Sequence, residues 1–275
     1  MKVWINGGLF DPEEASISVY DHGLIVGDGV FETVRAGHGR PFVLTPHLQR
    51  LARSAEGLGL PAPDLDAVER GVRDVLAAAP AWAVGWIRIT HTSGVGPLAS
   101  NRGDQGPTTV VAVAEGWSFP APADVAVVPW PRCENGALVG LKTTSYGENV
   151  KALDHARQRG AGEAVFANLA GNLCEGTGSN VFVVVDGRLT TPPLSSGCLA
   201  GITRELVLEW SGGEEADLPI EQFAHCEEAF LTSTTRDVQP IRLVDGKALP
   251  AAPGPVTSRV RETFAERSAK LLESS

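Results

Sequence analysis

The residues best suited to covalent chemistry are spread along the second half of the sequence. Lys142 is followed by Glu175, and hydroxyl-bearing loops come later at Gly201-Ile202-Thr203 and Ser233-Thr234-Thr235. A lysine amine forms a Schiff base with an aldehyde when burial keeps it neutral. A glutamate flanked by apolar strands needs a cationic partner, such as a protonated ring nitrogen. Because the two loops suit a phosphate, these parts together predict a pyridoxal phosphate site.

Each of these residues also has an ordinary interpretation when it is taken alone. Lys142 suits a solvated strand end and Glu175 an exposed turn, since charged side chains are mostly exposed. Thr203 suits a helix cap, and hydroxyl runs such as 233–235 are common in turns. The combination indicates the cofactor, with Lys142 as Schiff-base lysine and proton carrier and Glu175 facing the ring nitrogen. Arg50 is a further candidate, because an arginine binds phosphate bidentately, although a surface arginine fits equally well.

Charge and composition exclude several classes of partner. The formal net charge of −10 at pH 7 argues against nucleic acid and anionic membranes, because both require clustered lysine and arginine. The N-terminal sequence shows no signal peptide, and no stretch approaches the ~20 apolar residues of a membrane-spanning helix. The four cysteines form no CxxC pair and no metal-like spacing with histidine. We therefore expect a cytoplasmic protein with free thiols and no metal.

Apolar periodicity predicts helices and strands in both halves of the 275-residue chain, which indicates an α+β class. Residues 27–35 alternate like a strand, 46–60 have helical spacing, and a helix opens on Thr203. The stretch 117–124 is rich in proline and small residues, as linkers are. The predicted organisation is a small N-terminal domain, an interdomain linker and a larger cofactor-binding domain, with the bounds 1–116, 117–123 and 124–275.

Several motifs resemble the class IV aminotransferases, the fold-type IV pyridoxal phosphate enzymes. They span nearly the whole chain: GDGVFETVR at 27–35, HLQRL at 47–51, the run from Glu175 to Arg204, and TSTTRDVQP at 232–240. The resemblance implies a two-domain α+β fold like that of D-amino acid aminotransferases, with the active site between the domains. It also implies a homodimer in which a loop of the second subunit touches each site.

The resemblance also assigns roles to individual residues. Lys142 corresponds to the Schiff-base lysine and Glu175 to the partner of the pyridine nitrogen. The residues implied to hold the phosphate are Arg50, Ile202, Thr203, Ser233 and Thr234. Tyr146 stands four places after the lysine, whereas branched-chain enzymes have a tyrosine five places after it, so it receives no role.

The member of the family is a second question. The loop from Thr92 lacks the Arg-x-His pair of D-amino acid aminotransferases, and Thr143 to Tyr146 replaces the Gly-Gly-Asn-Tyr run of branched-chain enzymes. The loop of many 4-amino-4-deoxychorismate lyases, GGRGY, is also missing, since Gly94 to Leu98 stands there. The context KTTSYGENVKAL with RGAGEAVF nevertheless looks most like such lyases.

The leading expectation is therefore a lyase that forms 4-aminobenzoate and pyruvate in folate biosynthesis, acting on a small amino substrate. The alternative is an aminotransferase for D-amino acids, branched-chain amino acids or (R)-amines. A third hypothesis is a non-enzymatic binding protein that retains the fold, against which the intact Lys142 and Glu175 argue. Both reactions use the same cofactor residues, so the cofactor motif does not separate them. The substrate candidates are Phe31, Trp86, Arg88 and the loop 93–104. Arg88 can bind a carboxylate bidentately or be an exposed strand residue.

Overall fold

The computed structural model describes residues 1–117, 119 and 122–274. Contacts divide the chain into two compact units. The first contains residues 1–117, 141–146 and 270–275, and the second contains residues 118–140 and 147–269. Three residues of the predicted 117–123 linker, 118, 120 and 121, lie outside the part of the chain that the structure describes.

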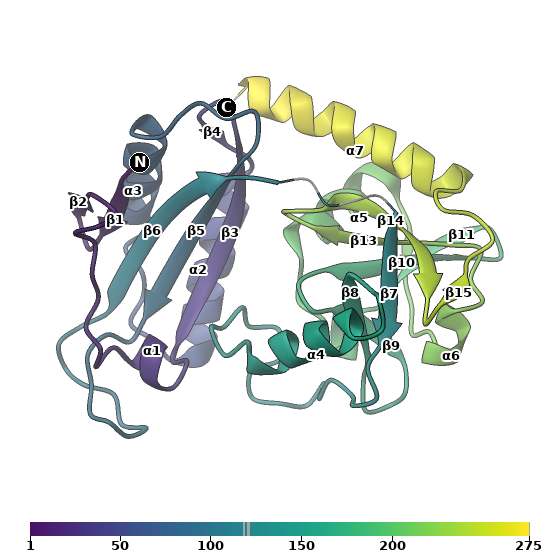
Figure 1. Cartoon of the computed structure of the whole chain (residues 1–275), viewed down its shortest axis with the longest axis horizontal. Coiled ribbons are helices and arrows are strands. Elements are labelled where there is room, and N and C mark those ends of the chain that lie inside the picture. Colours follow the sequence, from purple (N-terminus) through teal and green to yellow (C-terminus); the bar gives the residue numbers. More distant parts are fainter. Residues whose placement is uncertain (118, 120–121, 275) are drawn as a thin grey trace. The chain divides into compact units, whose positions relative to one another are not determined.

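The first unit is a six-stranded sheet with the order β2-β1-β6-β5-β3-β4. Its strands are β1 (Val3–Ile5), β2 (Gly8–Phe10), β3 (Gly29–Gly37), β4 (Arg40–Pro41), β5 (Gly85–Thr92) and β6 (Thr108–Glu115). Its helices are α1 (His22–Ile25), α2 (Leu44–Leu58) and α3 (Leu65–Ala77). Figure 1 shows α2 and α3 on one face of this sheet, where Leu51, Val72 and Ile87 join a single buried core.

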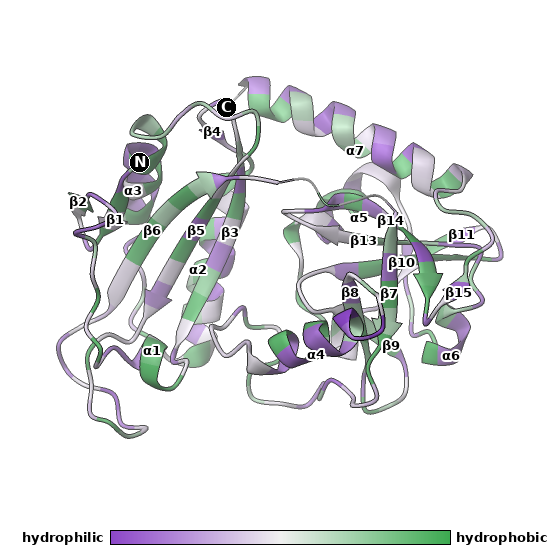
Figure 2. Ribbon diagram, viewed as in Figure 1, coloured by the Kyte–Doolittle hydropathy of each residue, from purple (hydrophilic) through white to green (hydrophobic). Residues whose placement is uncertain are grey.

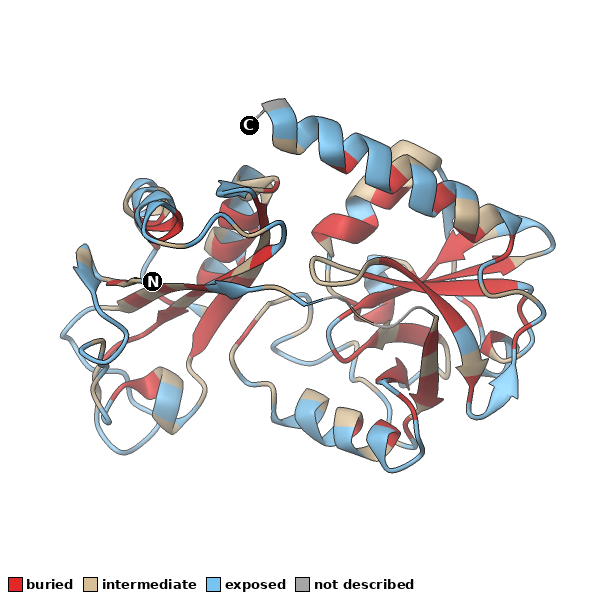
Figure 3. Ribbon diagram, turned by 45° about the horizontal axis from the view of Figure 1, so that its top comes forward, coloured by how far each residue is buried: buried red, intermediate tan, exposed pale blue. Residues whose placement is uncertain are grey.

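The sequence forms α2 and α3 for recognisable reasons. Apolar residues recur at helical spacing along α2, and its exposed residues include Gln49, Arg53 and Glu56. Figure 3 shows by colour how far each residue of the chain is buried. Gly59 ends α2 with a φ of 70°, a conformation in which glycine avoids the penalty of a side chain. Asp64 caps α3 by accepting a hydrogen bond from the Ala67 N–H.

The second unit contains a nine-stranded sheet whose main path is β12-β11-β10-β13-β14-β7-β8-β9, with β15 paired to β14. Its strands are β7 (Ala123–Val127), β8 (Glu163–Ala167), β9 (Leu173–Gly176), β10 (Asn180–Val185), β11 (Arg188–Thr191), β12 (Glu214–Glu215), β13 (Glu228–Ser233), β14 (Asp237–Val244) and β15 (Lys247–Ala248). Its helices are α4 (Gly147–Arg157), η1 (Leu194–Ser196), α5 (Ile202–Ser211), α6 (Ile220–Phe223) and α7 (Pro255–Ser274), the last of which ends among residues grouped with the first unit.

The strands of this second sheet are largely apolar, whereas polar and apolar residues alternate along α4 and α7 (Figure 2). The β10–β11 hairpin turns at Asp186-Gly187, where both residues have positive φ, as the dipeptide predicts. The described cysteines are all free thiols. Among the described residues, none of the helices combines the length and the apolar character that crossing a lipid bilayer demands.

The segment of Lys142 is grouped differently from the boundary that the sequence suggested. The prediction placed residues 124–275 in one domain, but residues 141–146 and 270–275 are grouped with the first unit. Thr143 forms a β-bridge with Val30, and the Phe31 N–H donates to the Lys142 carbonyl at 2.9 Å. Backbone pairing with β3 is therefore the physical reason why the lysine segment joins the first unit.

Candidate functional site

In the first unit, Lys142 lies on a short extended segment that is fixed by its backbone. Besides the bond from Phe31, the Thr144 N–H donates to the Gly29 carbonyl at 2.8 Å. The Lys142 N–H donates to the Ser54 hydroxyl at 3.2 Å, and the Thr144 hydroxyl donates to the Gly27 carbonyl at 2.9 Å. The position of the lysine thus depends on main-chain groups more than on the side chains around it.

The amine of Lys142 lies beside an aromatic ring that other candidate residues share. Its Nζ is 4.2 Å from the centroid of the Phe31 ring and 5.9 Å from that of Tyr146. The Arg88 guanidinium carbon lies 4.0 Å from the same Phe31 centroid, and Tyr146 meets Phe31 edge-on at 5.1 Å. The first unit therefore collects an amine, a guanidinium and a phenol around Phe31.

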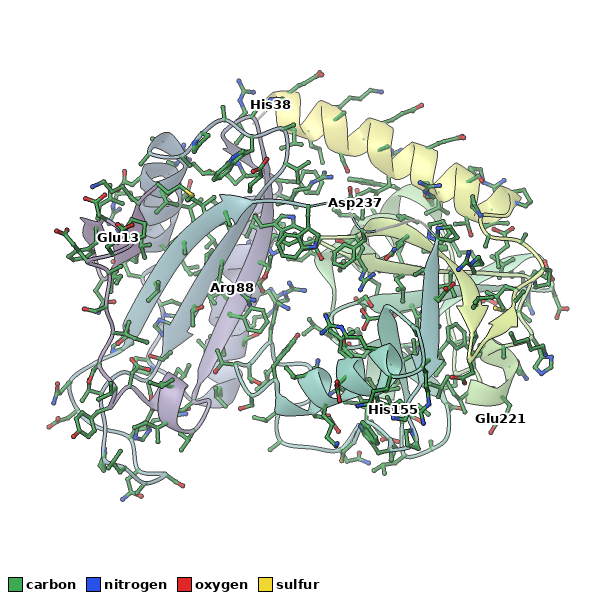
Figure 4. The ribbon with its side chains drawn as sticks, in the orientation of Figure 1. Glu13, His38, Arg88, His155, Glu221 and Asp237 are labelled. Atoms are coloured by element: carbon green, nitrogen blue, oxygen red, sulfur yellow. The ribbon has the colours of Figure 1, made fainter. Side chains whose placement is uncertain are left out.

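Arg88 extends from β5 in this group (Figure 4). Its side chain is exposed, yet neighbouring protein atoms displace part of its water, which lowers the pKa of its guanidinium. A partly desolvated arginine binds an anion more strongly than a fully hydrated one. Trp86, the third substrate candidate, is half-buried on the same strand and packs against Trp117.

Arg50 has a partner that the sequence did not indicate. Its Nε and Nη2 donate to the two oxygens of Glu32 at 2.7 and 2.8 Å, and Glu32 has no solvent exposure. His47 Nδ1 lies 2.7 Å from the same carboxylate. Burial alone would raise the pKa of Glu32, but Arg50 and His47 outweigh it and hold that pKa at about 2. Phosphate binding by Arg50 stays a prediction, because much of its charge is already compensated.

In the second unit, Glu175 occupies a strand rather than the exposed turn of its ordinary interpretation. It lies in β9, opposite Phe166 of β8, because Asn168 closes the intervening turn by accepting from the Asn172 N–H at 2.8 Å. Its Oε2 accepts a hydrogen bond from the Leu199 N–H at 2.9 Å. Strand pairing and this bond together fix the direction of the carboxylate.

The Gly201-Ile202-Thr203 loop forms the start of α5. Gly201 is the N-cap residue and provides no side-chain cap, and both Ile202 and Thr203 are buried. The Thr203 hydroxyl belongs to the first turn and is not the cap. A Cβ on Gly201 would lie 1.9 Å from Asn180 Oδ1, while Asn180 Nδ2 donates to the Leu199 carbonyl at 2.8 Å. Glycine and this asparagine therefore hold the loop closely against β10.

The Ser233-Thr234-Thr235 loop is the turn from β13 to β14, which ends at Asp237 (Figure 4). The Ser233 hydroxyl accepts from the Arg236 N–H at 3.2 Å and lies 3.2 Å from the Thr235 hydroxyl. Asn180 and Thr232 are register partners on β10 and β13. The Gly201-Ile202-Thr203 loop, which lies against Asn180, and the turn after Thr232 are therefore at the same end of these two strands.

A buried carboxylate that the sequence did not reveal connects parts of this site. Glu163 Oε1 accepts from the Thr177 hydroxyl and from the Thr177 N–H at 3.2 Å. Its Oε2 accepts from the Ser179 hydroxyl at 3.1 Å and from Arg236 Nη2 at 3.1 Å. Glu163 thereby links the turn after Glu175 to the turn that carries Ser233. A glutamate at the head of an apolar strand is a sequence signal that indicates such a buried carboxylate.

The second-unit residues fit the cofactor that the sequence predicts. The first N–H groups of α5 have no side-chain cap, which is typical of a helix N-terminus that binds phosphate. The Thr203 and Ser233 hydroxyls are hydrogen-bond donors for such an anion. Glu175 provides the anionic group that a protonated ring nitrogen requires. No cluster of potential metal ligands occurs in the part of the chain that the structure describes.

Comparison with known proteins identifies the family. Residues 29–244 match the family described as amino-transferase class IV. A putative branched-chain-amino-acid aminotransferase of Methanocaldococcus jannaschii is 32% identical over 96% of this chain and 95% of its own. A D-alanine aminotransferase of Staphylococcus haemolyticus is also 32% identical, over 96% of both chains.

Solved structures agree with the fold. The branched-chain aminotransferase of Thermoproteus uzoniensis has a TM-score of 0.90 and 32% identity, covering 100% of this chain and 96% of its own. A putative 4-amino-4-deoxychorismate lyase of Legionella pneumophila has a TM-score of 0.87 but 22% identity, covering 94% and 97%, and shows the fold alone. The chain belongs to the class IV aminotransferases, enzymes of fold type IV that use pyridoxal 5′-phosphate.

Proposed function

We propose that this protein is an aminotransferase that moves an amino group between an α-amino acid and a 2-oxo acid. The observation that carries the proposal is the group around Phe31, in which the Lys142 amine and the Arg88 guanidinium lie 4.2 and 4.0 Å from one ring centroid. An amine suits proton transfer at the α-carbon. A guanidinium suits the carboxylate that every amino acid carries and that a simple amine lacks.

The two aminotransferases among the relatives support this choice over the lyase. Both are 32% identical to this chain over nearly its whole length. The sequence favoured the lyase through the context of Lys142, but Thr144 and Ser145 both donate their hydroxyls to the Gly27 carbonyl. These hydroxyls therefore shape the backbone, and their presence is no argument for a lyase substrate.

The chain's own residues would divide the work as follows. Bound pyridoxal phosphate supplies an electron-withdrawing ring that stabilises negative charge at the α-carbon. Lys142 Nζ holds the cofactor and carries the proton, Arg88 binds the substrate carboxylate, and Phe31 gives both a common apolar surface. Glu175 holds the ring nitrogen through a charge-assisted hydrogen bond. The hydroxyls of Thr203, Ser233 and Thr234, with the α5 N-terminus and Arg50, bind the phosphate.

The deciding experiment mixes cofactor-loaded protein with D- and L-amino acids one at a time, without an oxo-acid acceptor. An amino donor is expected to convert the cofactor to pyridoxamine phosphate with loss of the lysine-bound absorbance. A parallel sample receives 4-amino-4-deoxychorismate and is assayed for 4-aminobenzoate and pyruvate. Release of both products, with no pyridoxamine phosphate from any amino acid, would replace the proposal by the lyase.

Arg88 provides a test of the substrate class. We expect Arg88→Gln to raise KM for amino acids by about tenfold to a hundredfold, the range of one charge-assisted contact. Its effect on (R)-amines, which lack a carboxylate, should be small. Equal loss for amino acids and amines would show that Arg88 shapes the site rather than binding the carboxylate.

We also propose that the protein is a homodimer, as the family resemblance implies. Six large apolar side chains of the first unit are between 46% and 73% exposed: Ile17, Val19, Tyr20, Leu24, Val26 and Leu98. The Gly96 N–H donates to the Tyr20 carbonyl at 3.1 Å, so the two segments that carry them are adjacent. An apolar surface of this kind is typical of a protein interface.

Sedimentation of wild type and of Leu24→Glu tests this surface. Wild type is expected to sediment as a dimer and Leu24→Glu as a monomer, because a charge in an apolar interface is left without a partner. Leu194→Glu is the matched control, since Leu194 is 48% exposed in the second unit. If Leu24→Glu stays dimeric, this apolar surface is not the dimer interface.

A further inference from the structure

Arg132 makes a set of contacts beside Glu175, and the site described above gives Arg132 no role. It lies between β7 and α4, and its N–H donates to the Ala167 carbonyl at 2.7 Å. Its guanidinium carbon is 4.0 Å from the centroid of the Phe166 ring, and Phe166 is the cross-strand partner of Glu175. The guanidinium is therefore placed over the β8–β9 pair that carries Glu175.

The guanidinium lies between two carboxylates. Its Nη1 donates to Glu148 Oε2 at 2.6 Å and to Asn149 Oδ1 at 3.1 Å. On the other side, its Nε is 3.6 Å from Glu175 Oε1. Nε and Nη2 are both buried and have no hydrogen-bond partner among the residues that the structure describes. The interaction between Arg132 and Glu175 is therefore an attraction between charges at 3.6 Å and not a hydrogen bond.

Two buried thiols beside Glu175 favour their neutral form. Burial raises the pKa of the Cys198 thiol to about 11, and the charge of Glu175 adds to the effect. Burial also raises the pKa of the Cys174 thiol, again with help from Glu175. Arg132, at 3.6 Å, is a charged group of the second unit that acts on Glu175, and Glu148 lies behind it.

We propose that Arg132 is a positioning residue that keeps Glu175 ionised and so keeps the proton on the ring nitrogen of the cofactor. This inference rests on the proposed role of Glu175 and goes beyond it. One proton is shared by a carboxylate and a ring nitrogen, and it can reside on either. Arg132 is attracted to the carboxylate only when the proton is on the nitrogen, so its positive charge favours that arrangement.

Glu148 opposes this effect from the far side of the arginine. Its side chain is 45% exposed, against 16% for Arg132 and 15% for Glu175. A negative charge bound to Arg132 weakens the attraction between Arg132 and Glu175. Removal of the charge at Arg132 should therefore make the ring nitrogen less protonated, and removal of the charge at Glu148 should make it more protonated. Loss of a purely structural contact would change the protonation in the same direction in both variants.

The experiment uses the full chain loaded with pyridoxal phosphate labelled with ¹⁵N in the ring, without substrate. The ¹⁵N chemical shift reports directly whether the ring nitrogen carries a proton. We expect Arg132→Gln to move the shift toward that of the neutral ring, with the ratio of the two proton positions changed by about tenfold, equal to one pKa unit. Arg132→Lys, which also loses the planar guanidinium but keeps the charge, should stay close to wild type.

The two substitutions at 132 separate charge from shape. A shift in both variants, or in neither, would overturn the proposal. Glu148→Gln should leave the nitrogen protonated, and a shift toward the neutral ring in this variant would also overturn it, even if Arg132→Gln does not fold. Because no substrate is present, an error in the proposed substrate leaves the result unchanged. Failure of wild type to bind the cofactor would instead refute the proposed function.

Discussion

The two units hold their functional residues by different means. In the first unit, the segment of Lys142 is fixed by main-chain bonds to Gly29 and Phe31 of β3. In the second, the turn after Glu175 and the turn at Ser233 are fixed by the side chain of Glu163. Backbone pairing tolerates a change of side chain, whereas a buried carboxylate with five hydrogen-bond donors does not. The lysine should therefore be replaceable without loss of fold, and the second unit should be sensitive to single substitutions.

The largest expected effect is on activity, at Lys142. Lys142→Ala should lower the rate by at least about a hundredfold to ten-thousandfold, the usual contribution of acid–base catalysis, because no other amine replaces it. The melting temperature should stay near that of wild type, since the bonds of residue 142 to Phe31 and Ser54 use backbone atoms. Steady-state kinetics and thermal unfolding measure the two quantities, with Lys151→Ala on α4 as the control. A large fall in the melting temperature of Lys142→Ala would show that the lysine segment depends on its side chain, contrary to the difference described between the two units.

The largest effect on stability is expected at Glu163. Glu163→Gln leaves the buried Arg236 guanidinium without its counter-charge. The side chains of Glu163 and Arg236 are 2% and 8% exposed. The free energy of unfolding should fall by about 3 kcal/mol, as for other broken buried pairs. Denaturant titration measures this fall. Glu214→Gln is the control: it removes an exposed pair with Arg188, and its effect should stay below about 1 kcal/mol.

A comparable effect with a pH signature is expected at Glu32 in the first unit. Its pKa is about 2 when folded against an ordinary 4.5, so its ionisation stabilises the fold above pH 4.5. That contribution, about 3 kcal/mol from the size of the shift, disappears as the pH falls from 4.5 toward 2. Glu32→Gln should be less stable at pH 7 and should lack this acid-dependent loss.

Unfolding of wild type and Glu32→Gln across this pH range tests the sign. Glu69→Gln serves as the control, since Glu69 pairs with Arg73 on the surface and both side chains are at least 40% exposed. A Glu32→Gln variant with the full acid-dependent loss would show that other carboxylates are responsible for it.

The smallest effect is expected at Ser54, whose hydroxyl is the side-chain group that accepts from the Lys142 N–H at 3.2 Å. Ser54→Ala should lower the free energy of unfolding by about 1 kcal/mol, the usual value for one hydrogen bond. Activity should change less than threefold, because the Phe31 and Gly29 bonds remain. Kinetics and unfolding of this variant measure both quantities; a loss of activity like that of Lys142→Ala would show that the main chain alone does not place the lysine.

The sequence predicted much of this molecule, and its errors have physical causes. The alternation of 27–35 and the helical spacing of 46–60 correspond to β3 and α2, because local periodicity fixes such elements. The ordinary interpretation of Glu175 as an exposed turn residue is wrong, because Glu175 lies in β9 and that strand depends on pairing with β8. The specificity prediction favoured a lyase from short motifs around Lys142, whereas relatives over the whole length are aminotransferases.

By itself the sequence predicted the candidate chemical groups, since an amine, a carboxylate and two hydroxyl loops are properties of residue type and order. It also determined the family. The tertiary structure decided what surrounds these groups. Glu32 pairs with Arg50, and Glu163 accepts hydrogen bonds from two turns. Asn180 contacts Gly201, and Arg132 lies beside Glu175. These contacts join residues distant in the chain and depend on burial, and neither spacing nor local propensity encodes which buried charges will meet.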